Sequence, residues 1–159
     1  LFVGVYVDDL IVMEEAEYCK TLRAHLEQFF PTKNLGALSY YTGCEYSRDY
    51  VRGTSKITQT ACIDRLVDKF DVSSSNPIPS LTSSSICPGG EKEARFEGSY
   101  REAGGGLLWI ANSRRPDISK ALREVARPAH DPSDEHSKVV LKITQYLRGT
   151  RELGIVYRK

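Results

Sequence analysis

Two short apolar runs at the start of the chain flank a pair of adjacent aspartates. Residues 1–7 and 10–13 are rich in β-branched and aromatic side chains, and each run can form one buried strand. The pattern predicts a β-hairpin with Asp8 and Asp9 at or beside its turn. Asp-Asp is unfavourable there, because a tight turn prefers residues that accept positive φ and because the two charges repel. A hard divalent cation such as Mg²⁺ would offset this repulsion, which makes the pair a candidate metal site, with an ordinary solvated turn as the alternative.

Composition limits the class of protein. The 159 residues are 40% hydrophobic and 27% charged, which is typical of a soluble globular chain, and no apolar run approaches the length of a membrane span. The four cysteines are widely spaced and share no metal-ligand spacing with the three histidines. We therefore expect reduced thiols in an intracellular protein, cytoplasmic or nuclear, that is neither secreted nor bound to a membrane. Because the chain starts in an expected core strand, we also expect it to be an excerpt from a longer polypeptide.

Hydrophobic periodicity predicts helices and strands after the hairpin. The expected elements are a helix over 14–30, strands over 38–46 and 55–59, a helix over 60–70 with Thr60 as its N-cap, helices that begin at Ser99, Pro116 and 131–133, and a final strand over 153–157. Residues 73–98 are rich in Ser, Pro and Gly and are predicted to be a linker. Residues 104–106 are helix-interior glycines, each costing about 0.8–1 kcal/mol relative to alanine, so either another element packs closely there or the helix starts later. Trp109 is expected in the core, because Leu108 and Ile110 flank it.

Four stretches of the sequence, in series and at fitting distances, resemble one family of enzymes. They are residues 6–9, residues 33–38 with 41–45, residues 57–59 with 63–70, and residues 115–118 with 130–132, 136 and 146–150. Together they resemble the reverse transcriptase, an RNA-directed DNA polymerase, of copia-type LTR retrotransposons, in its C-terminal half from the Tyr-x-Asp-Asp box onward. The resemblance covers nearly the whole chain.

The resemblance implies an α+β fold in two parts. Residues 1–72 would be a partial polymerase palm of β-hairpins plus a helix, and residues 99–159 a mainly helical region, like a thumb and connection, that ends in a strand. The complete enzyme would bind an RNA or DNA primer–template and a deoxynucleotide, and would use two Mg²⁺ or Mn²⁺ ions for nucleotidyl transfer. The family's fingers and its other metal-binding aspartate precede the Tyr-x-Asp-Asp box and are absent from this sequence. We therefore expect the chain to be inactive alone.

The resemblance also implies roles for individual residues. Asp8 and Asp9 would bind the metal ions and act in catalysis. The implied nucleotide and primer contacts are Tyr6, Val7, Lys33, Gly43, Cys44 and Glu45, and the implied contacts to the nucleic-acid backbone are Arg114, Arg115, Lys120 and Arg123. An ordinary bulge explains the glycine equally well, a solvated loop explains the lysine better, and a solvated basic face explains the four cations equally well.

A role without catalysis is the second hypothesis. Residues 1–99 carry 10 Lys and Arg against 14 Asp and Glu, whereas residues 100–159 carry 12 against 7. The basic C-terminal part could follow a phosphate backbone. The chain would then be a retrotransposon-derived module that binds nucleic acid or an unidentified protein partner, and the aspartates would be relics. An inert fragment that still folds is the third.

Overall fold

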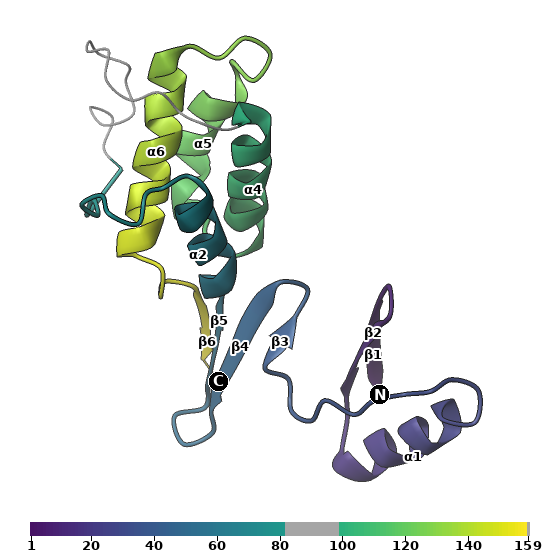
Figure 1. Ribbon diagram of the computed structural model, residues 1–159. Helices are drawn as coiled ribbons and strands as arrows, with labels where there is room; N and C mark the ends of the chain where they lie inside the picture. The colour runs from purple at the N-terminus through teal and green to yellow at the C-terminus, as the bar shows by residue number, and fades with distance from the viewer. Residues whose placement is uncertain (82–98, 159) are drawn as a thin grey trace. The chain divides into compact units, whose positions relative to one another are not determined.

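The computed structural model of the chain describes residues 1–81 and 99–158 (Figure 1). The chain divides into two compact units, Leu1–Thr42 and Gly43–Lys159. The fold class is α+β, as the sequence predicted, because both units combine helices with antiparallel strands. Within the described residues, no helix combines the length and the apolar character needed to cross a membrane.

The first unit is built on the predicted hairpin. Strand β1 (Phe2–Tyr6) pairs antiparallel with β2 (Asp9–Met13), and helix α1 (Ala16–Leu26) follows. This helix ends earlier than its hydrophobic periodicity predicted, and a loop then leads to the two-residue strand β3 (Tyr40–Tyr41). The hairpin therefore forms from its own sequence pattern, whereas the apolar residues after α1 lie outside any helix.

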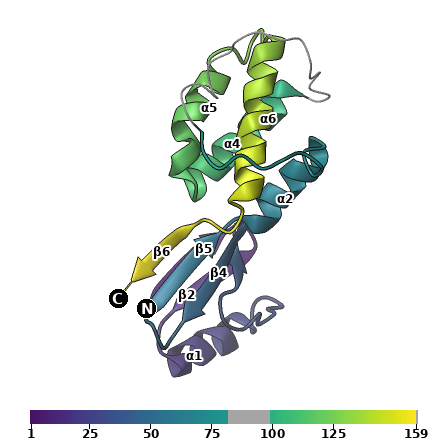
Figure 2. The ribbon, with the colours of Figure 1, turned by 90° about the vertical axis from the view of Figure 1, so that its left-hand side faces the viewer.

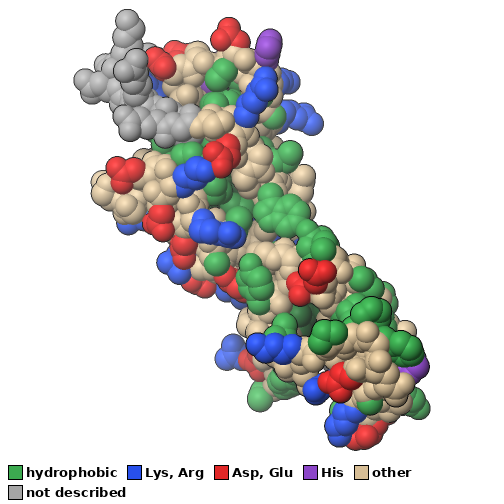
Figure 3. All heavy atoms as spheres, turned by 45° about the vertical axis from the view of Figure 1, so that its right-hand side comes forward, with side chains coloured by type: hydrophobic (Ala, Val, Ile, Leu, Met, Phe, Trp, Pro, Cys, Tyr) green, Lys and Arg blue, Asp and Glu red, His purple; other side chains and the backbone are tan. Residues whose placement is uncertain are grey.

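The first unit lacks a hydrophobic core of its own. No residue from 1 to 42 is buried, and α1 contributes no buried side chain. In the hairpin Phe2 is 58% exposed and Val5 is 68% exposed, although the sequence predicted strands with a buried face. Figure 3 shows hydrophobic side chains open at the molecular surface. The hairpin is thus held mainly by its backbone ladder and a few local side-chain contacts.

The strands of the second unit lie in the order β4-β5-β6, and each pair is antiparallel (Figure 2). They are β4 (Cys44–Asp49), β5 (Thr54–Thr58) and β6 (Ile155–Arg158). The end of the chain thus returns to pair with β5. Gly154 permits this return, because a Cβ at that position would lie 2.1 Å from the carbonyl oxygen of Ile57.

Within the described part of the second unit, four helices enclose the core at the opposite end from the strands (Figure 1). They are α2 (Thr60–Lys69), α4 (Tyr100–Ser113), α5 (Ser119–Ala126) and α6 (Asp134–Gly149), and the 3₁₀ helix η1 (Pro116–Ile118) precedes α5. The large apolar side chains that are almost completely buried include Ile63, Leu107, Ile110, Ile118, Ile143 and Leu147. All four helices therefore depend on one shared core.

Two local predictions fail for identifiable reasons. The strand expected over 38–46 is interrupted, because Thr42 and Gly43 have φ of 49° and 76° and form a two-residue turn between β3 and β4. Positive φ at both central residues defines a type I′ turn, which suits a hairpin. The N-cap of α2 also differs, because Thr60 is the first residue of the helix and Gln59 is its N-cap. A carboxylate from strand β4, and not the hydroxyl of Thr60, accepts hydrogen bonds at this helix start.

The division into two units differs from the boundary that composition suggested. Residues 73–98 were predicted to separate two parts, yet α2 lies before this segment and packs with α4 and α6 behind it. The buried side chains of Ile63 and Val67 on α2 account for this, because they belong to the shared core. Most of the predicted linker, residues 82–98, lies outside the described residues.

The three glycines of α4 differ in their surroundings. The helix runs through them and begins at Tyr100, so the expectation of a later start is wrong. A Cβ at Gly106 would lie 3.0 Å from Cδ2 of Leu66, whereas nothing lies within 4 Å of a Cβ at Gly104 or Gly105. Only Gly106 is therefore a point of close approach between helices.

We expect Gly104→Ala and Gly105→Ala each to raise the free energy of unfolding by about 0.8–1 kcal/mol, because alanine is the better helix former and meets no neighbour. Gly106→Ala is the matched control and should gain less or lose stability, because Leu66 must move. Urea unfolding followed by circular dichroism at 222 nm measures all three. Equal gains at the three positions would contradict the packing at Gly106.

Candidate metal site and predicted nucleic-acid contacts

The two aspartates lie at the tip of the first hairpin. Val7 and Asp8 form its two-residue turn, and Asp9 opens β2 directly opposite Tyr6. Val7 has a φ of 53°, in the left-handed region where a β-branched residue is strained by about 1–3 kcal/mol. Glycine would remove this strain. Because strained backbone is concentrated at functional sites, the turn is a candidate for more than a structural role.

An aromatic contact supports one side of the turn. The ring of Tyr6 meets the ring of Tyr41 edge to face, with centroids 6.4 Å apart and planes at 72°. Such pairs contribute about 0.5–1.5 kcal/mol beyond their buried area. Val7 is 82% exposed, and Asp8 and Asp9 are exposed beside it. The turn therefore presents both aspartates to solvent from a hairpin that is supported on its Tyr6 side.

The ligands available at the turn suit a Mg²⁺ ion that keeps several water ligands better than a metal ion enclosed entirely by protein ligands. The described residues contain no group of three or more His, Cys, Asp or Glu side chains that could hold a metal ion. Asp8 and Asp9 supply carboxylate oxygens, and proteins often bind Mg²⁺ through one or two carboxylates together with water and substrate phosphates. The chemistry of the pair is therefore compatible with part of a Mg²⁺ or Mn²⁺ site, for which further ligands would be needed.

Glu45, a predicted primer contact, caps helix α2. Its carboxylate accepts hydrogen bonds from the hydroxyl of Thr58 at 2.8 Å, from the backbone N–H of Thr60 at 3.1 Å and from that of Ala61 at 2.8 Å. Burial alone would raise the pKa of Glu45, but these hydrogen bonds outweigh it and leave the pKa below its ordinary value. The carboxylate thus satisfies two N–H groups that a helix start leaves without partners.

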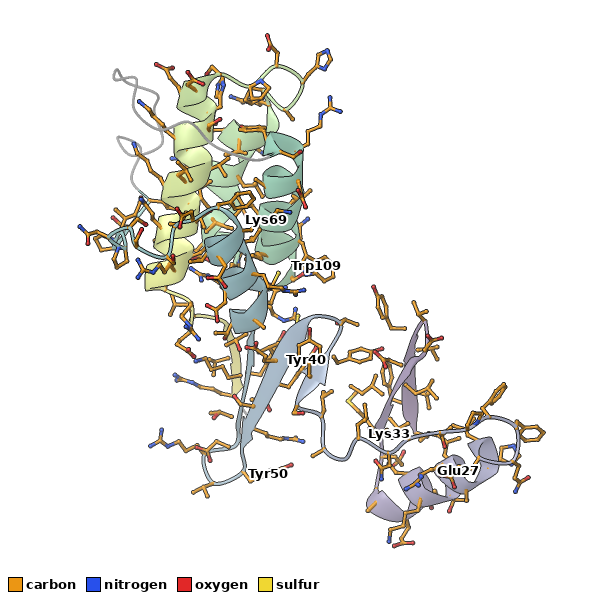
Figure 4. All side chains as sticks on the ribbon, viewed as in Figure 1. Glu27, Lys33, Tyr40, Tyr50, Lys69 and Trp109 are labelled. Carbon is orange, nitrogen blue, oxygen red and sulfur yellow. The ribbon has the colours of Figure 1, made fainter. Side chains whose placement is uncertain are left out.

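The other predicted primer and nucleotide contacts have different environments. Gly43 occupies the type I′ turn. Cys44 is 2% exposed, and burial raises the pKa of its thiol. Cys19, Cys44 and Cys62 are free thiols, as predicted, and Cys87 lies outside the described residues. Lys33 is exposed in the loop after α1 (Figure 4).

Arg115, a predicted backbone contact, is a structural residue with only 2% of its surface exposed. Its Nε donates to Oδ1 of Asp117 at 2.9 Å, and its Nη1 donates to the carbonyl of Thr150 at 2.9 Å. The guanidinium also lies over the ring of Tyr146, 5.4 Å from its centroid. These contacts join η1 to the end of α6. The sequence-based role for Arg115 is therefore corrected, because a guanidinium committed inside the fold is not available to a phosphate.

The remaining predicted cations do not form one continuous track with Arg115. Arg114 is half-buried, and its Nη2 donates to the hydroxyl of Tyr46 at 3.4 Å. Lys120 and Arg123 are exposed on α5. Trp109 is 47% exposed, which corrects the expectation of a core position (Figure 4). The buried face of α4 is made by residues 100, 103, 107, 110 and 111, so position 109 faces outward.

Sequence comparison finds similarity to transposon proteins over most of the chain. It is 30% identical over 155 residues to the retrovirus-related Pol polyprotein from transposon TNT 1-94 of Nicotiana tabacum, a match that covers 92% of the chain. It is 26% identical over 162 residues to the Pol polyprotein from transposon RE2 of Arabidopsis thaliana, with the whole chain covered. It is also 24% identical over 168 residues, 99% of the chain, to a putative transposon Ty5-1 protein of Saccharomyces cerevisiae.

These relatives are longer than the chain. The chain spans 12% of the Nicotiana polyprotein, 11% of the Arabidopsis polyprotein and 52% of the yeast protein. No protein-family model matches the chain, and no solved structure matches it. Over essentially its whole length, the chain is therefore similar to segments of retrotransposon Pol polyproteins.

Proposed function

We propose that this chain is a segment of a retrotransposon reverse transcriptase and supplies one part of a two-metal site for nucleotidyl transfer. The observation that carries the proposal is the position of Asp8 and Asp9 at the tip of a tight hairpin, next to the strained backbone of Val7. The resemblance of residues 6–9 to the Tyr-x-Asp-Asp box supports the proposal. The similarity of the whole chain to transposon Pol polyproteins supports it further.

In this function the chain binds metal and positions it. The carboxylates of Asp8 and Asp9 would hold the ions, and because both are exposed at the turn, substrate phosphates could reach ions bound there. When bound, a metal pair supplies charge stabilisation to the attacking and leaving oxygens of the transferred phosphoryl group. Tyr6 lies next to this site and is restrained by Tyr41. Because the donor set is incomplete, the chain alone holds metal weakly and does not polymerise.

Metal binding by the isolated chain tests this proposal through nuclear magnetic resonance. Bound Mn²⁺ broadens nearby signals, so we expect the backbone amides of residues 6–10 to broaden first in a Mn²⁺ titration. Asp8→Asn and Asp9→Asn should each abolish the selective broadening, because each removes a charged oxygen ligand. Asp131→Asn is the matched control, since Asp131 is an exposed aspartate outside the hairpin, and it should leave the broadening unchanged.

Two results would count against the proposal. Broadening that is equal across the surface aspartates would show that the hairpin does not concentrate metal. Mg²⁺-dependent extension of a DNA primer on an RNA template by the purified chain, abolished by Asp8→Asn, would contradict the expectation that the chain is inactive alone.

A further inference from the structure

The end of the β4–β5–β6 sheet that lies away from the helices carries a hollow with basic and aromatic walls. The strand register places Arg48 opposite Ser55 and Ser55 opposite Tyr157, so these side chains form one row across three strands. Tyr50, in the turn after β4 (Figure 4), and Arg158, at the end of β6 in the neighbouring row of the register, also line the hollow. The hollow has a volume of about 460 Å³. We call these five residues the sheet-end surface.

The charge of the sheet-end surface is positive. Arg48 and Arg158 line the hollow, and both are exposed. Asp49 also lines the hollow. Its Oδ1 accepts hydrogen bonds from the backbone N–H groups of Val51 and Arg52 in the adjoining turn, each at 2.9 Å. Neither lining arginine has a carboxylate partner among the described residues, although the charge of Asp49 offsets part of their attraction for an anionic ligand.

The aromatic rings of this surface are unusually open to solvent. Tyr50 is 78% exposed and Tyr157 is 56% exposed. The guanidinium of Arg48 lies over the ring of Tyr50, 5.3 Å from its centroid, which keeps both groups side by side at the rim of the hollow. Exposed rings next to guanidinium groups are the usual elements of a surface on which unpaired bases stack while phosphates pair with cations.

We propose that the sheet-end surface binds single-stranded nucleic acid, with bases stacked on Tyr157 and Tyr50 and phosphates paired with Arg48 and Arg158. Single strands fit better than duplexes, because the bases of a duplex are already stacked on one another and cannot cover a ring. The site is distinct from the carboxylate turn and from the exposed cations of α5. It does not depend on the proposed function, because Asp8 and Asp9 take no part in it.

Fluorescence anisotropy with a labelled 15-residue oligo(dT) or oligo(U) tests the proposal on the whole chain. The double variant Arg48→Ala/Arg158→Ala should weaken binding about tenfold or more and lower the slope of log K against log salt by about 1.4, since each phosphate contact on a single strand contributes about 0.7. The matched control is Lys20→Ala/Arg23→Ala, which removes the same charge from exposed positions of α1 and should leave the affinity within about twofold. Thermal unfolding followed by circular dichroism verifies that each variant folds.

A second pair of variants separates stacking from charge. Tyr157→Ala should weaken binding about tenfold, because a stacked base is lost, whereas Tyr157→Phe retains the ring and should keep the affinity. An unchanged affinity in Tyr157→Ala would overturn the proposal and leave only a patch for general anions. A larger loss in the α1 control than in the sheet-end variant would overturn it as well, and so would tighter binding of a 15-base-pair duplex than of the single strand.

Discussion

Replacing Asp117 with alanine is expected to lower the free energy of unfolding of the second unit by about 3 kcal/mol, because it leaves the buried guanidinium of Arg115 without its counter-ion. Asp117 binds Arg115 through both carboxylate oxygens and also accepts a hydrogen bond from the hydroxyl of Tyr146 at 2.9 Å. A charge that is 98% removed from solvent cannot recover the lost interaction from water. Urea unfolding followed by circular dichroism measures the loss.

Replacing the other member of the pair, Arg115, should lower the free energy of unfolding by less. Arg115→Met removes the buried charge itself and retains an unbranched apolar side chain, while Asp117 is 37% exposed and can return to water. Asp131→Ala is the control for removing an exposed aspartate and should change stability by less than about 0.5 kcal/mol. If Asp117→Ala costs no more than Asp131→Ala, the Arg115 network does not hold the second unit together.

The same pair also predicts how stability depends on pH. Burial would raise the pKa of Asp117, but the hydrogen bonds from Arg115 and Tyr146 and the charge of Arg115 outweigh it and leave the pKa below its ordinary value of 3.8. A group with a lowered pKa in the folded state contributes stability that is complete above its unfolded pKa and is lost as pH falls through the folded value. At pH values below about 3.8, the urea concentration at the unfolding midpoint should therefore decrease more steeply with falling pH in the unaltered chain than in Asp117→Ala.

Gly154→Ala is expected to destabilise the second unit by about 3 kcal/mol, because the added methyl group meets backbone and not a flexible side chain. Its Cβ would lie 2.1 Å from the carbonyl oxygen of Ile57 and 3.0 Å from the carbonyl carbon, and neither atom can move without shifting β5. Relief requires β6 to separate from β5 at their first pair, Ile57 with Ile155. Urea unfolding and the hydrogen-exchange rates of the β5 and β6 amides measure both effects.

Gly105→Ala is the control for this substitution, because it adds the same methyl group where nothing lies within 4 Å. It should raise the free energy of unfolding by about 0.8–1 kcal/mol and leave β6 amide exchange unchanged. An unaltered unfolding midpoint in Gly154→Ala would mean that β6 contributes little to the stability of the second unit.

Most helices and strands that have a local signal in the sequence could be predicted. The hairpin followed from two apolar runs around the aspartates, and the helix start at Ser99 followed from its capping pattern, since the hydroxyl of Ser99 accepts from the backbone N–H of Glu102 at 3.4 Å. The helix start expected at 131–133 has a local contact of the same kind, because Nδ1 of His136 accepts from the backbone N–H of Ser133 at 3.1 Å. Such signals act within four residues, so one sequence is enough to detect them.

Features that depend on residues far apart in the chain could not be predicted in this way. Nothing local indicates that Glu45 caps α2 or that Arg115 pairs with Thr150, 35 residues further along. The row from Arg48 through Ser55 to Tyr157 requires the pairing of β5 with β6, which sequence alone does not give. Trp109 was placed in the core from its apolar neighbours, although the spacing of the buried residues on α4 would have placed it outside.

The lack of buried side chains in residues 1–42 bears on preorganisation at the aspartate turn. A catalytic constellation must be held within about 0.5 Å of its productive geometry, which normally requires packed residues behind the liganding groups. Behind Asp8 and Asp9 there is a ladder of backbone hydrogen bonds and one aromatic contact, from Tyr6 to Tyr41. If the turn binds metal as proposed, part of the free energy of binding would go into ordering the hairpin, and a partner that packs against its apolar faces would raise metal affinity without contributing a ligand.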